Sequence, residues 1–168
     1  IFFSLNNKLK GGFDFLVAYL GVIAKQEGID NLLRSVHYIV YQRKITNIKF
    51  MIVGTGTHWQ NMVDLSRKMG LAEYVYFTGF IPYEQLYEIL STADLCVNPE
   101  FRDEFTDKST MIKIMDYMVF GKPIVQYETT EGRVTAGDAA RYISKNNEVD
   151  FAEAVIEMLN DPERRMKM

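Results

Sequence analysis

Short apolar runs alternate with segments of helical periodicity along most of this chain. The runs are rich in Val, Ile, Phe and Tyr and are bounded by glycine or polar residues. Such runs are typical of strands buried on both faces of a parallel sheet. They predict strands at residues 15–20, 50–53, 74–77, 95–97, 124–126 and 141–143.

The segments between these runs place apolar residues three or four positions apart, as one face of a helix does. They predict helices at 29–41, before Gly70, after Pro82, at 110–120 and at 149–159, where Asp161-Pro162 ends the last one. This alternation predicts an α/β fold, a Rossmann-like parallel sheet of about six strands with helices on both faces. We assign residues 15–168 to this domain and residues 1–14 to a linker or arm.

Ligands of such sheets bind beyond the carboxyl ends of the strands. The loops that follow the predicted strands are therefore the candidates for a binding site, and they cover residues 21–28, 54–57, 79–82, 99–108 and 127–137. The last of these is polar and glycine-rich. Its Arg133 is expected to be solvated, with a phosphate or acceptor contact as the alternative.

The stretch 107–126 predicts a loop, a helix, a sharp stop at Gly121 and a strand. Ser109 or Asp107 is expected to cap the helix. At about 100° per residue, one face carries only apolar side chains and the opposite face carries Ser109, Lys113 and Asp116. The apolar face consists of Ile112, Met115, Met118 and Val119. We expect the methionine stripe, which includes Met111, and Cys96 to lie in the core.

Gly54-Thr-Gly56 follows a predicted strand and precedes a helix. Such a turn lets the backbone approach a diphosphate, or it serves only as a tight turn that needs the positive φ of glycine. The third glycine of a dinucleotide fingerprint is replaced by Trp59, which argues against a nicotinamide dinucleotide site.

The pattern within 109–125 resembles the donor-site signature of the group 1 retaining glycosyltransferases, which have the GT-B fold. The matching residues are Ser109, Lys113, Asp116, Tyr117, Met118, Gly121, Lys122, Pro123, Ile124 and Val125. The resemblance extends from about Val17 to Asp161. It implies the C-terminal, nucleotide-sugar-binding one of two Rossmann-like domains, so that the N-terminal domain is missing from this chain.

The resemblance implies a nucleotide-diphosphate sugar, most commonly a UDP-sugar, as the substrate, and no metal or other cofactor. Asp116 would accept hydrogen bonds from the ribose, and Ile81 would meet the base. The residues expected to bind the donor nucleotide or its diphosphate are Gly54, Gly56, Lys25, Ile81, Lys108, Ser109, Thr110, Lys113 and Asp116. No residue of the chain is assigned a catalytic role.

Three positions differ from the family pattern. Val22 and Glu27 stand where the family usually has an Arg and a Lys that bind the diphosphate, and Lys108 stands where it has the first of two Glu residues. Lys25 could supply the missing charge near the first pair. The carboxylates that could replace the missing Glu are Asp103, Glu104 and Asp107.

Composition narrows the possible functions. The chain is 48% apolar with a net charge of −3, which is typical of a globular domain and argues against nucleic-acid binding. Its single cysteine and two histidines give no metal-ligand cluster, and no apolar run is long enough to cross a membrane.

The sequence therefore predicts a donor-binding domain of a hexosyltransferase of polysaccharide biosynthesis, inactive by itself, in the cytoplasm or at the cytoplasmic face of a membrane. The acceptor, whether a glycan, a lipid or a small molecule, is unknown. Two alternatives stay open: a non-catalytic nucleotide-binding or interaction module with a degenerate donor site, and another GT-B enzyme such as a nucleotide-sugar epimerase or a phosphorylase.

Overall fold

A computed structural model describes residues 5–168 and contains one parallel sheet of six strands, in the order β3-β2-β1-β4-β5-β6. The strands are β1 (Phe15–Leu20), β2 (Ile48–Val53), β3 (Val75–Gly79), β4 (Leu95–Asn98), β5 (Ile124–Tyr127) and β6 (Ala140–Ile143). All six were predicted, most to within two residues, and every neighbouring pair is parallel. The Rossmann-like α/β prediction is confirmed.

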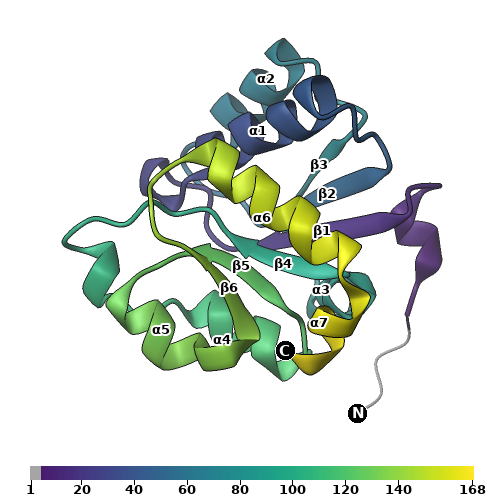
Figure 1. Cartoon of the computed structure of the whole chain (residues 1–168). Helices are drawn as coiled ribbons and strands as arrows, with labels where there is room; N and C mark the ends of the chain where they lie inside the picture. The colour runs from purple at the N-terminus through teal and green to yellow at the C-terminus, as the bar shows by residue number, and fades with distance from the viewer. Residues whose placement is uncertain (1–4) are drawn as a thin grey trace.

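Helices cover both faces of the sheet (Figure 1). The α-helices are α1 (Ile29–His37), α2 (Trp59–Lys68), α3 (Tyr83–Thr92), α4 (Ile112–Val119), α5 (Thr130–Ala136), α6 (Glu148–Asn160) and α7 (Pro162–Lys167). A π-helical turn extends α1 over Tyr38–Gln42, and 3₁₀ turns cover Asn7–Lys10, Lys25–Glu27, Thr106–Lys108 and Gly137–Ala139. Helices α1, α2 and α6 share one core cluster with the sheet, and α3, α4 and α5 share the other.

Helix α4 packs with the opposite face from the one that its hydrophobic pattern predicted. Ile112 and Val119 are 71% and 80% exposed, and Met115 and Met118 are also exposed. The residues that face the sheet are Lys113, Ile114 and Tyr117. The prediction that the methionine stripe is core is therefore wrong for Met115 and Met118, whereas Cys96 is fully buried as expected.

Two short helices near the C-terminal end were not predicted. The polar, glycine-rich stretch 127–137 predicts a loop, but it contains α5, whose first turn is capped by Thr129. Glycine is needed at position 132 inside this helix, because a Cβ there would come within 2.6 Å of the Thr129 hydroxyl. Pro162 begins α7 rather than only ending α6, and the Asp161 side chain caps it.

Glycines let the strand-end loops pack against one another at the carboxyl edge of the sheet. A Cβ on Gly54 would lie 2.0 Å from the carbonyl oxygen of Gly21, and one on Gly56 would lie 2.4 Å from that of Ile23. A Cβ on Gly28 would lie equally close to the carbonyl oxygen of Pro99. The loops after β1, β2 and β4 therefore form one packed unit.

Within residues 5–168, none of the helices combines the length and the apolar character that spanning a membrane requires.

The close packing at Gly56 predicts a large effect of a single methyl group. Gly56→Ala should lower the free energy of unfolding by about 3 kcal/mol, because the Ile23 carbonyl oxygen is backbone and cannot rotate away. Gly79→Ala is the control: Gly79 has φ 69° but open space around it, so only about 1–2 kcal/mol of backbone strain is expected. Urea unfolding of both variants checks this, and an equal loss in the two would contradict it.

Candidate functional site

The strand order places the candidate site between β1 and β4. The chain runs from β1 toward β3 on one side of the sheet, and from β4 toward β6 on the other. Loops 21–28 and 99–111 therefore leave the sheet in different directions, and the region between them at the carboxyl ends of these two strands, called the crevice below, is where such folds bind ligands. Figure 1 shows that the helices following β1 and β4 cover opposite faces of the sheet.

A buried ion pair spans this crevice. The ammonium of Lys113 on α4 lies 2.7 Å from a carboxylate oxygen of Glu27, in the loop after β1, and only 9% and 18% of these side chains are exposed. The Tyr19 hydroxyl donates to the same carboxylate at 3.1 Å, and the Lys113 ammonium lies 4.8 Å from the centre of the Tyr19 ring. The hydrophobic pattern places Lys113 on the face of α4 opposite the apolar stripe, and in the structure that face is the buried one, where Glu27 neutralises the Lys113 charge.

Helix α4 begins above this pair without a side-chain cap. Its N-cap residue is Met111, and among residues 5–168 no side-chain hydrogen bond caps its first turn. The predicted caps are engaged elsewhere: Ser109 Oγ donates to the carbonyl of Phe105, and Asp107 accepts from the amide and the hydroxyl of Thr130. These hydrogen bonds hold the pKa of Asp107 below its usual range. The first-turn N–H groups of α4 can therefore meet an anion.

Glu100 is a buried carboxyl group that the sequence analysis did not single out. It is 4% exposed, and within residues 5–168 its Oε2 atom has no hydrogen-bond partner. It shares a small pocket with Asn98, whose Oδ1 atom is also buried and unpartnered, and with Met111 at the start of α4. Burial raises the pKa of Glu100 to about 7, against the opposing effect of the Lys113 charge.

The three carboxylates proposed as replacements for the missing Glu lie in other surroundings. Asp103 accepts from the amides of Phe105 and Thr106 and so closes a local turn, which holds its pKa low. Asp107 is bound to the start of α5, and Glu104 is exposed. In the sequence, no spacing rule marks an unpaired carboxyl group. The one hint for Glu100 is that it follows the buried strand β4 by two residues.

The remaining predicted donor-binding residues come from several elements and differ in exposure. Lys25 and Lys108 are exposed. Ile81 is half-buried against the core under α3 and α4. Asp116 is half-buried as well, and burial raises its pKa. Gly54 and Gly56 have the packing role described above.

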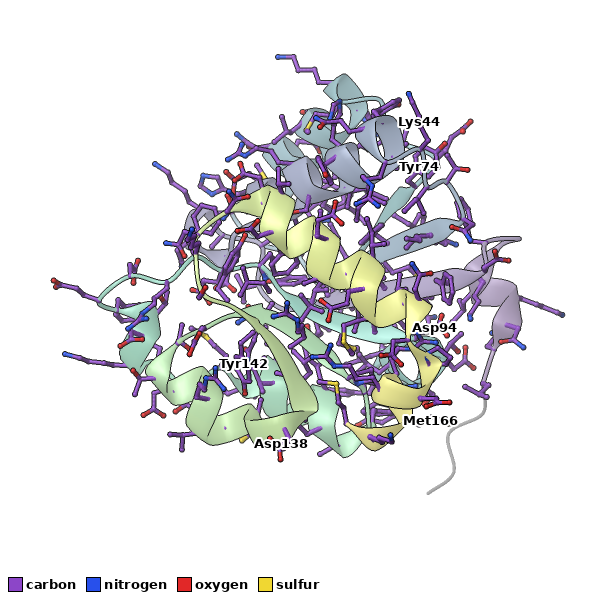
Figure 2. All side chains as sticks on the ribbon, in the orientation of Figure 1. Lys44, Tyr74, Asp94, Asp138, Tyr142 and Met166 are labelled. Carbon is purple, nitrogen blue, oxygen red and sulfur yellow. The ribbon has the colours of Figure 1, made fainter. Side chains whose placement is uncertain are left out.

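The end of the site near β6 is held by hydrogen bonds to α5. Thr110 donates from its hydroxyl to Glu131 at 3.0 Å. Tyr142 of β6 lies beside α5 (Figure 2), and its hydroxyl donates to the Gly137 carbonyl at 2.7 Å. Arg133 was expected in a solvated loop, but it lies on α5, where it pairs with Glu128 and stacks over the Tyr142 ring.

Among residues 5–168, no three His, Cys, Asp or Glu side chains cluster closely enough to hold a metal ion.

Comparison with known proteins gives one consistent family. Residues 14–161 match the family model described as "Glycosyl transferases group 1". The chain is 25% identical over 155 residues to the alpha-D-kanosaminyltransferase of Streptomyces kanamyceticus, a match that covers 91% of this chain and 38% of that protein. The chain thus spans well under half the length of this relative.

Two solved structures show the same fold. WaaG, a glycosyltransferase involved in lipopolysaccharide biosynthesis, superposes with a TM-score of 0.77 at 16% identity, over 96% of this chain and 42% of WaaG. Anabaena Alr3699/HepE in complex with UDP-glucose superposes with a TM-score of 0.77 at 15% identity, over 95% of this chain and 43% of HepE. These likenesses confirm the half of a GT-B fold that the sequence predicted.

Glu100→Gln should stabilise the protein at neutral and alkaline pH. The unfolded carboxyl group loses its proton near pH 4.5 and the folded one near pH 7, so the folded state binds more protons between these values. The contribution of Glu100 to the free energy of unfolding therefore falls as the pH rises from about 4.5 to about 7. The advantage of the Gln variant should grow from about pH 4.5 to about pH 7 and stay level above it.

Urea unfolding across this pH range measures the effect. The matched control is Glu104→Gln, an exposed glutamate of the same loop, which should change the free energy of unfolding little. A Glu100→Gln effect that is the same at pH 5 and pH 8 would contradict the burial of an unpaired carboxyl group.

Proposed function

Because the chain belongs to the group 1 glycosyltransferase family, we propose that it binds the nucleotide-diphosphate sugar donor of a retaining glycosyltransferase, with UDP as the nucleotide. The observation that carries the proposal is the uncapped start of α4 at the crevice between β1 and β4. Asp116 follows one turn later on the same helix. A helix start favours phosphate, and a carboxylate favours the two hydroxyls of a ribose.

The proposed chemistry is stabilisation of a leaving diphosphate. Charge builds up on the diphosphate as the bond to the sugar breaks, and fixed N–H dipoles at a helix start stabilise it without reorganising. Lys108 and Lys25, both exposed, are the basic side chains that could add to this effect. The proposal also includes a cytoplasmic location and a role in polysaccharide synthesis, and both rest on the family resemblance alone.

UDP is favoured over other nucleotides by the relatives. Anabaena Alr3699/HepE was solved with UDP and with UDP-glucose. The rival proposal is a non-catalytic module with a degenerate donor site, and the presence of Val22 and Glu27 in place of two cations favours it. Binding of a nucleotide separates the two proposals.

Calorimetric titration with UDP, GDP and NAD tests the proposed ligand. We expect UDP to bind more tightly than NAD, because the turn at Gly54 is closed by the carbonyl of Gly21 and lacks the third glycine of a dinucleotide site. Tighter binding of NAD would refute the proposal, and no binding of either diphosphate would favour the non-catalytic module.

Asp116→Ala should weaken UDP binding about ten-fold or more, since a hydrogen bond to a charged group contributes about 1.5–3 kcal/mol. Asp138→Ala is the control, because Asp138 is an exposed aspartate beyond α5 and is not expected to touch the nucleotide. Both variants should keep the circular dichroism spectrum of the parent. An unchanged UDP affinity in Asp116→Ala would leave Asp116 without a role in binding.

This chain by itself should transfer no sugar. The proposed site is one side of a cleft, and transfer needs the acceptor hydroxyl within about 3–3.5 Å of the sugar carbon. The chain matches only 38% of the length of its kanosaminyltransferase relative. A radiolabelled-donor assay should detect turnover by the full-length gene product and none by residues 1–168. Comparable turnover by the two would mean that this chain holds a complete active site.

A further inference from the structure

The buried charges of the crevice do not balance. Lys113 is neutralised by Glu27, whose carboxylate oxygen lies 2.7 Å from the ammonium. Glu100 lies in the same region and remains without a cation of its own: no ion pair to it is found in the part of the chain that the structure describes, and its Oε2 atom is unpartnered. When Glu100 is ionised, the crevice carries one negative charge in excess.

The titratable groups that face Glu100 come from several elements. Lys113 on α4 favours its ionised form, whereas Glu27 after β1 and Asp103 on its own loop oppose it. Tyr19 of β1 is also electrostatically coupled to it. The wall contributed by β5 and α5 is uncharged and consists of Gln126, Thr129, Gly132 and Thr135.

A diphosphate at the start of α4 would meet this excess charge. Glu100 and Met111, the N-cap residue of α4, line the same pocket. Two negative charges in a low-dielectric site repel each other strongly. Glu100 is 4% exposed, so little water screens that repulsion.

We propose that Glu100 is a proton-binding residue of the donor site, which takes up a proton from solvent when the diphosphate of the donor binds at the start of α4. This inference rests on the proposed function. Protonation removes the repulsion and turns the Glu100 carboxyl group into a hydrogen-bond donor. Asn98 Oδ1, a buried acceptor without a partner, lines the same pocket and is available to that donor. One O–H bond forms on Glu100, and one breaks in the water or buffer acid that supplies the proton.

Calorimetry with UDP-glucose tests the proposal. A terminal phosphate, as in UDP, has a second pKa of about 6 and would itself release or bind protons, but the diphosphate of UDP-glucose is esterified at both ends. Titrations at pH 8 in two buffers with different ionisation enthalpies should show an uptake of about half to one proton per ligand bound. At pH 6 the uptake should be close to zero, because Glu100 already carries its proton.

Because a proton is taken up on binding, the affinity for UDP-glucose should also depend on pH. Above about pH 7, binding of UDP-glucose should weaken by up to about ten-fold per pH unit. Glu100→Gln, which is neutral at every pH, should bind with no proton uptake and with an affinity that stays constant from pH 6 to pH 8. Glu104→Gln, the exposed glutamate of the same loop, should behave like the parent.

The possible failures are distinguishable. Equal affinity of the parent at pH 6 and pH 8, with no dependence on the buffer, overturns the role of Glu100 and leaves nucleotide binding intact. Proton uptake that persists in a folded Glu100→Gln variant assigns the proton to another group and also overturns it. Absence of UDP and UDP-glucose binding at every pH overturns the proposed function, and this inference with it.

Discussion

The orientation of α4 depends on the buried ion pair between Lys113 and Glu27. A lysine that is 9% exposed is costly to bury unless a carboxylate neutralises it, so this pair fixes which side of the helix faces the sheet. Tyr117, one turn later, secures the same orientation, because its hydroxyl accepts from the amide of Leu20 on β1 and donates to the carbonyl of Val97 on β4. Helix α4 is thereby attached to both strands that border the crevice.

The rest of the site follows from that attachment. With α4 fixed over β1 and β4, the loop 99–111 must turn above the crevice, and it is tied to α5 through Asp107 and Thr110. Helix α5 is tied in turn to β6 through Tyr142. On the other side, the Pro99 carbonyl packs closely against Gly28, which has no side chain to prevent it. The walls of the site are therefore parts of one packed unit rather than independent loops.

Local patterns in the sequence were sufficient for the strands, because a run such as Phe15–Leu20 is buried on both faces and needs no partner to be recognised. The same approach failed for the face of α4, since periodicity assigns the apolar stripe to the core and cannot foresee that Glu27, distant in sequence, draws Lys113 inward. Helix α5 was missed because a polar, glycine-rich stretch that follows a strand favours a loop. Glu100 was missed because the absence of a partner is a tertiary property.

Within residues 5–168, Lys113 is the one buried Lys or Arg, and its pairing also limits how tightly this chain can hold a diphosphate. Lys113 is committed to Glu27, so the electrostatic contribution falls mainly to the start of α4, which supplies at most about 2 kcal/mol. A ribose contact by Asp116 adds about 1.5–3 kcal/mol. Together these reach about 5 kcal/mol before the loss of translational and rotational freedom on binding, which costs about 4 kcal/mol or more, so these two contacts alone hold a diphosphate only weakly. Tighter donor binding would need contacts beyond these two.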